Sequence, residues 1–322
     1  MAKTVKFEFG KQMRALRKAK GLTLEQLATG DPFDKKRGAI CDQSELAKYE
    51  RGERQPGWDK FEKLMQRLGE SAGKYYREYT MTPQDREYSK KKQTLMHLTR
   101  KGDAESIKDA KGLISELEQD AKFIKDRLNK QFILCINAII AHHQKDYQTM
   151  YNLALEGIKI TKPSFDEENI DKYTLFFVEI SLINQIAIAH KFISSLEKST
   201  SILLRLKSCL DRGHAGEEEY GKTYMQIQFN LSNNLGQLQR YDECLPICEA
   251  GAKYCDKRDD SFFLPLFMYN QGCCLLALNK KEEAIAILKD AMAIFKSFKR
   301  FDELSAATSY VRKTFGVEIE EN

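Results

Sequence analysis

Proline, tryptophan and histidine are scarce in this chain of 322 residues, which has six Pro, one Trp and five His. Proline is nearly absent from Thr82 onward, where apolar residues recur at helical spacing and no clear run alternates with a period of two. Proline interrupts helices, and periodicity distinguishes helices from strands. We therefore predict an all-α fold.

Long apolar runs are also missing. No window approaches eighteen uninterrupted apolar residues, and Met1 to Lys11 is polar and charged. A membrane-spanning helix and a secretory signal peptide both need such a run. We expect a cytoplasmic protein with no membrane partner.

The usual marks of an enzyme or a metal site are absent. The chain has no Gly-rich phosphate loop, no Cys-x-x-Cys pair and no persuasive Ser/His/Asp or Cys/His grouping. Its eight cysteines lie mostly in apolar helical runs and are predicted to be reduced core residues. Cys244 and Cys248 share a helix face, so a redox or metal sensor is an alternative, but no His lies near them. We predict no catalytic residue, no cofactor and no metal.

The positive charge is concentrated near the N-terminus. The net charge is +5; residues 1–80 contain eighteen Lys and Arg against twelve Asp and Glu, which leaves 34 against 35 for the rest. Such a split suits a nucleic-acid-binding domain joined to a body that does not bind DNA. We predict two domains, residues 1–80 and 81–322.

A short polar helix is predicted at the centre of the first domain. Asp42 is a good N-cap, Glu45 would complete a capping box, and Gly52 is a natural end. Leu46 and Tyr49 fall on one face and are expected in the core. The remaining surface carries side chains that can bond base edges, namely Gln43, Ser44 and Lys48.

Three further short helices surround this one in the prediction. The first carries Phe9, Met13 and Leu16 and ends at Gly21, and the second is capped by Thr23. The last follows Pro56-Gly57. The inward residues of the second helix are Leu24 and Leu27, and those of the helix after Pro56-Gly57 are Phe61, Leu64 and Leu68. Four such helices make a helix-turn-helix module.

The order of these residues resembles the Xre/Cro-type helix-turn-helix family. The matching segments run from Arg14 to Thr23 and from Gln43 to Pro56. The resemblance implies duplex DNA as a partner, with Gln43, Ser44 and Lys48 in the major groove and Arg14 and Arg54 on phosphates. Leu24 departs from the family, which usually has a phosphate-contacting Gln at that place.

The connection before the polar helix is longer than the family's turn. It spans thirteen residues, Thr29 to Cys41, and contains Lys35, Lys36 and Arg37. These three side chains either clamp the DNA backbone or belong to a solvated loop that is merely basic.

The second domain shows an internal repeat with an offset of forty residues. Asn230, Leu235 and Cys244 can be laid over Asn270, Leu275 and Ala284, and weaker copies begin near Ala138 and Ile183. The pattern resembles the tetratricopeptide repeat, and residues 301–315 are predicted to form a capping helix. We therefore predict an α-solenoid of helix pairs.

The first helices of the predicted pairs are rich in amide side chains. Asparagine is disfavoured inside helices, so its repetition on one face needs a reason. An amide can bond the backbone of an extended peptide, and apolar rings can form pockets for its side chains. The candidate peptide-binding residues are Asn184, Asn230, Asn233, Asn270, Gln226, Phe177, Phe229 and Tyr269. Alternatively, the amides bond one another or water.

Taken together, both domains resemble the cytoplasmic peptide-pheromone receptors of Gram-positive bacteria, the group containing Rgg, PlcR, PrgX and NprR. This resemblance implies a transcriptional regulator that is controlled by a short signalling peptide and whose repeat body dimerises. Because one short helix covers only a few base pairs, we expect the homodimer to act on an inverted-repeat operator. The competing interpretation is a tetratricopeptide adaptor that binds a protein partner and has no peptide-switched DNA binding.

Overall fold

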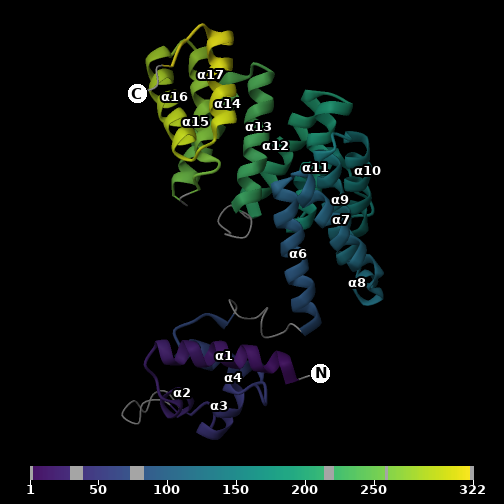
Figure 1. The fold of residues 1–322 in the computed structure, drawn as a ribbon, viewed down its shortest axis with the longest axis vertical. Helices are drawn as coiled ribbons and strands as arrows, with labels where there is room; N and C mark the ends of the chain where they lie inside the picture. The colour runs from purple at the N-terminus through teal and green to yellow at the C-terminus, as the bar shows by residue number, and fades with distance from the viewer. Residues whose placement is uncertain (1–2, 30–38, 73–82, 214–220, 258–259, 320–322) are drawn as a thin grey trace. The chain divides into compact units, whose positions relative to one another are not determined.

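The computed structural model describes residues 3–29, 39–72, 83–213, 221–257 and 260–319. Within these ranges the chain forms helices and turns without any strand, which confirms the all-α prediction. It divides into two compact units, Met1–Thr94 and Leu95–Asn322 (Figure 1). The predicted domain boundary between residues 80 and 81 lies outside the described ranges. Over those ranges, each helix is too short or too polar to cross a bilayer.

The N-terminal unit packs its short helices around a small apolar core. Its described helices before the second unit are α1 (Lys3–Ala19), α2 (Leu24–Thr29), α3 (Gln43–Glu50) and α4 (Trp58–Arg67). The side chains of Met13, Leu27, Leu46, Phe61 and Leu64 are fully buried in this core. These are residues that the helical periodicity predicts to point inward, so the local pattern and the packing agree.

Gly10 lets α1 approach the end of α3 closely. A Cβ atom at this position would lie 2.3 Å from the backbone oxygen of Tyr49, a distance that real Cβ atoms do not adopt. Only glycine fits there, because the obstacle is rigid backbone rather than a flexible side chain.

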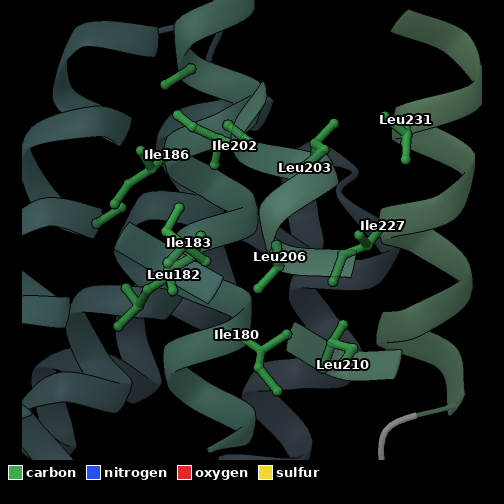
Figure 2. Packing of buried hydrophobic residues seen from close by; sticks show 14 of the residues in the cluster. Ile180, Leu182, Ile183, Ile186, Ile202, Leu203, Leu206, Leu210, Ile227 and Leu231 are labelled. Carbon is green, nitrogen blue, oxygen red and sulfur yellow. The ribbon is translucent and has the colours of Figure 1, made fainter. Parts of the chain in front are cut away.

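The second unit begins within α6 and consists of stacked helices. These are α6 (Pro83–Lys101), α7 (Ala104–Gln119), α8 (Ala121–Lys125), α9 (Arg127–His143), α10 (Tyr147–Thr161), the 3-10 helix η1 (Glu167–Lys172), α11 (Phe177–Ile193), α12 (Leu196–Gly213), α13 (Gly221–Gln237), α14 (Tyr241–Asp256), α15 (Leu264–Ala277), α16 (Lys281–Ser297) and α17 (Phe301–Phe315). Figure 2 shows how Ile183 of α11, Leu206 of α12 and Ile227 of α13 contribute to one buried core.

The turns between paired helices repeat the same backbone conformation. Lys145 joins α9 to α10, Gln239 joins α13 to α14 and Asn279 joins α15 to α16, with φ of 59°, 57° and 61°. A left-handed residue lets the chain reverse sharply after a helix. Gln239 and Asn279 are forty residues apart, which is the offset that the sequence repeat predicts.

The first helices of the pairs form a continuous row. Contacts run from α9 to α11, from α11 to α13 and from α13 to α15, and each second helix packs on its partner and on the next first helix. At the C-terminal end, α17 packs on α15 and α16, with Val311 fully buried. Its bounds, Phe301–Phe315, match the predicted capping helix.

Candidate functional site

The α3 helix begins and ends where its sequence predicts. The Oδ1 atom of Asp42 accepts a hydrogen bond from the Glu45 N–H at 2.7 Å. At the other end Gly52 has φ of 70°, and its N–H bonds the Tyr49 oxygen at 3.0 Å while the Glu53 N–H bonds the Lys48 oxygen at 2.9 Å. This pair of bonds is the Schellman motif, which satisfies the last carbonyls of a helix.

The predicted capping box of α3 is only half formed. Glu45 does not return a bond to Asp42; its carboxylate accepts from the Tyr49 hydroxyl and from Lys60 Nζ, the latter at 3.0 Å. These hydrogen bonds lower the pKa of Glu45, because they favour the charged carboxylate. Arg54, a candidate phosphate contact, lies 3.6 Å from the same carboxylate and is otherwise exposed.

Three polar residues of α3 are exposed to solvent, whereas its polar residue Glu50 is buried. Gln43, Ser44 and Lys48 are all exposed, whereas Leu46 and Tyr49 are buried. Arg14 is exposed on α1, and Lys35, Lys36 and Arg37 lie outside the described residues. The three predicted base-reading side chains thus belong to one exposed helix surface.

A buried ion pair, which the helical pattern of the sequence does not predict, holds α3 against α1. Arg17 donates from Nε to Glu50 Oε1 at 2.5 Å and from Nη2 to Oε2 at 2.9 Å, and its Nη1 donates to the Leu22 oxygen. The two side chains are 10% and 5% exposed, so the charges are shielded from solvent. Arg17 therefore positions the helix rather than adding to the exposed basic surface.

The asparagines of the second unit form hydrogen bonds across the row of first helices. Asn230 Nδ2 donates to Asn184 Oδ1 at 3.2 Å, which links α13 to α11. Asn270 Nδ2 donates to Asn233 Oδ1 at 2.8 Å and to Ser232 Oγ at 2.9 Å, which links α15 to α13. The structure brings the four predicted asparagines together in two pairs, which we name the amide ladder. The amides bond one another, as the alternative interpretation expects.

A pocket of about 190 Å³ adjoins the amide ladder at its C-terminal end. Asn233, Tyr269 and Asn270, three of the predicted peptide-binding residues, line it together with Tyr310 of the capping helix. Burial raises the pKa of Tyr269 above its ordinary value. The pocket combines apolar walls with amides, a composition typical of ligand sites.

The other predicted peptide-binding residues lie outside this pocket lining. Asn184 is buried, Gln226 is exposed and Phe177 is half-buried at the start of α11. Phe229 packs against Phe263 and Phe267, with ring centroids 6.1 and 6.2 Å away. Its ring therefore contacts the neighbouring helix pair.

Two buried glutamines, which no sequence pattern singles out, are additional candidates for the peptide site. The Oε1 atoms of Gln185 on α11 and Gln228 on α13 are buried and accept no hydrogen bond among the described residues. Buried acceptors without partners are costly and rare. Both belong to the helices that carry Asn184 and Asn230.

The N-terminal unit matches a known domain family over most of its length. Residues 8–73 match the family described as "Helix-turn-helix domain". This segment is a helix-turn-helix domain. The helix α3 lies within this segment and carries the exposed Gln43, Ser44 and Lys48. No curated protein sequence matches the chain.

Several solved structures share the fold of both units. Bacillus thuringiensis PlcR, in complex with the peptide PapR7 and DNA, is 19% identical, with 93% of this chain and 98% of PlcR covered and a TM-score of 0.63. ComR from S. thermophilus, in complex with DNA and its signalling peptide ComS, is 14% identical, with coverage of 96% and 100% and a TM-score of 0.59. A cysteine-to-serine variant of the Streptococcus dysgalactiae SHP pheromone receptor Rgg2 is 16% identical, with coverage of 95% and 99% and a TM-score of 0.58. At these identities the likeness establishes the fold.

Proposed function

We propose that this protein is a cytoplasmic transcriptional regulator whose helix-turn-helix domain binds duplex DNA. The observation that carries the proposal is the exposed set Gln43, Ser44 and Lys48 on a helix held rigidly from behind by Leu46 and Tyr49. Glutamine pairs with adenine in two places, and lysine donates to guanine. The shared fold with PlcR and ComR, both solved with DNA, supports this assignment.

The DNA-reading role is tested by selecting ligands of the full chain from random duplex DNA and then comparing variants on the selected sequence. Gln43→Ala is expected to lose about 1–3 kcal/mol of discrimination at one base position. Arg14→Ala and Arg54→Ala should weaken binding to all sequences alike and flatten the salt dependence. Gln66→Ala removes an exposed glutamine from α4 and serves as the matched control.

Failure to bind duplex DNA in a salt-dependent manner would favour the alternative function, a tetratricopeptide adaptor. An adaptor would instead retain a protein partner through the second unit. Unchanged base preference in Gln43→Ala, with DNA binding intact, would mean that another surface reads the sequence.

We further propose that a short signalling peptide binds along the amide ladder and the adjoining pocket. Each amide has two N–H donors and an oxygen with two lone pairs, so the ladder has capacity beyond the hydrogen bonds described above. The unpartnered oxygens of Gln185 and Gln228 on the same helices support a polar ligand. The PlcR and ComR structures contain a bound peptide, and Rgg2 is a pheromone receptor. The shared fold therefore favours the same class of ligand for this protein.

Peptide binding is tested with a library of random short peptides offered to the full chain, followed by calorimetry on the selected peptide. The double variant Asn230→Ala with Asn270→Ala removes one donor from each pair of the ladder and is expected to weaken binding by at least tenfold, about 1.4 kcal/mol. Asn152→Ala is the control, because Asn152 is an exposed asparagine on the second helix α10. Equal affinity of the double variant and the control would place the peptide elsewhere.

A further inference from the structure

Three cysteines meet between α14 and α15 in the buried part of the second unit. Cys244 and Cys248 lie one turn apart on α14, and Cys274 comes from α15. Their Sγ atoms all lie within 4.8 Å of one another, and those of Cys244 and Cys248 are 3.7 Å apart. All three side chains are almost completely buried. The fold thus brings Cys274 to two thiols that lie 26 and 30 residues before it in sequence, and we name the three the thiol cluster.

The spacing of the thiol cluster suits a single metal ion. With metal–sulfur bonds of about 2.3 Å, tetrahedral geometry places neighbouring thiolates about 3.8 Å apart and trigonal geometry places them about 4.0 Å apart. The observed Cys244–Cys248 separation of 3.7 Å already agrees with these values. A change of less than about 1 Å in the position of the third sulfur completes the arrangement.

Packing alone does not account for cysteine at these places. Forty residues later, in the next copy of the repeat, Ala284 and Leu288 occupy the positions of Cys244 and Cys248 and are equally buried. Forty residues before Cys274 stands Asn234, which donates to Ser199 instead. The repeat therefore packs without sulfur elsewhere, whereas here all three meeting positions are cysteine.

We propose that Cys244, Cys248 and Cys274 bind one soft metal ion through three thiolates, with Zn²⁺ as the expected occupant. Thiolates select Zn²⁺ and Cu⁺ over harder ions. Three thiolates and Zn²⁺ have a net charge of −1, against −2 for Cu⁺, and a buried site opposes net charge. Zn²⁺ also prefers a fourth ligand, and the pocket lined by Cys244 and Cys274 offers an open side for water or a ligand atom.

This site adjoins the amide ladder but does not depend on the peptide proposal. Asn233 and Asn270 line the same pocket as Cys244 and Cys274. A metal ion in the thiol cluster therefore lies beside the surface proposed for peptide binding, and the two ligands are expected to influence each other's affinity.

The test is a titration of the reduced, metal-free full chain with Co²⁺, a coloured substitute for Zn²⁺. One equivalent of Co²⁺ is expected to produce sulfur-to-cobalt charge-transfer absorption. This absorption should disappear when added Zn²⁺ displaces the Co²⁺. X-ray absorption on the Zn²⁺-loaded protein should give three sulfur neighbours at about 2.3 Å. A parallel titration with Cu⁺ identifies which ion binds more tightly, and three sulfur ligands to either ion support the site.

The variants copy the next repeat so that packing is preserved. Cys244→Ala with Cys248→Leu reproduces Ala284 and Leu288 and is expected to weaken Zn²⁺ binding by at least about 100-fold, since even outer-shell changes cost 10–100-fold. Cys255→Ala is the control, because Cys255 is buried on the same helix but contacts Met225 Sδ. Absence of thiolate absorption in the folded native chain, fewer than three sulfur neighbours, or unchanged affinity in the double variant would overturn the proposal.

Discussion

Single side chains decide how firmly α3 is held against α1. The ion pair of Arg17 and Glu50 joins α1 to α3. The two residues are thirty-three positions apart in sequence, and both charges are buried. Removing one member of such a pair leaves the other charge unpaired in a poorly solvated place, which is costly. Replacing both by apolar residues of similar volume avoids that cost.

Arg17→Met is expected to reduce the free energy of unfolding of the N-terminal unit by about 3–5 kcal/mol, because Glu50 stays buried without a partner. The double variant Arg17→Met with Glu50→Leu should be clearly more stable than Arg17→Met. Trp58 is the sole tryptophan and lies on α4, so its fluorescence during urea unfolding of the full chain reports on this unit. Additive losses in the double variant would show that the pair does not act as a unit.

Helices of the second unit approach one another closely at small residues. A Cβ atom on Gly272 of α15 would lie 2.4 Å from Leu288 Cγ of α16. Gly112 of α7 has open space around its Cβ position. The same substitution therefore has opposite consequences at the two sites.

Gly272→Ala is expected to destabilise the second unit by about 1–3 kcal/mol, because the added methyl group forces α15 and α16 apart. Gly112→Ala should stabilise it by about 0.5–1 kcal/mol, since alanine loses less backbone entropy inside a helix. Thermal unfolding followed by circular dichroism at helical wavelengths measures both changes. Equal stability of the two variants would contradict the observed helix contact.

For the whole protein, the proposed function requires that the binding of DNA and the binding of the peptide are coupled. One short recognition helix reads only a few base pairs, so selective binding calls for two helix-turn-helix domains on an inverted repeat. The second unit would then supply the dimer contact. A peptide acts as a switch only if it binds one arrangement of the dimer better than another.

The full chain is expected to sediment as a homodimer at micromolar concentration with and without DNA. The selected peptide should change DNA affinity by about 5–150-fold, a coupling of roughly 1–3 kcal/mol. Linkage requires the selected DNA to change peptide affinity by the same factor, and calorimetry in both orders tests this equality. A monomeric chain whose DNA affinity does not change with the peptide would show that the two binding activities are independent.

Local features of this protein were predictable because local residues produce them. The helix α3 begins after Asp42 and ends before Gly52, as predicted. The forty-residue offset reappears in the left-handed turns at Gln239 and Asn279, and residues 301–315 form α17 as predicted. Caps and helical periodicity depend on neighbours within a few residues, so they can be read along the chain. Their prediction succeeded where a side chain had one local partner, and it failed for Glu45, which bonds Lys60 of another helix.

The contacts that join distant positions required the folded chain. The Arg17–Glu50 pair, the Asn184–Asn230 bond and the meeting of Cys274 with Cys244 and Cys248 all link residues on different helices. Such pairings depend on helix crossing and rotation, which follow from packing of the whole core and not from any short segment. The sequence therefore specified which helices form and which surfaces are polar, and packing settled which polar and sulfur atoms meet.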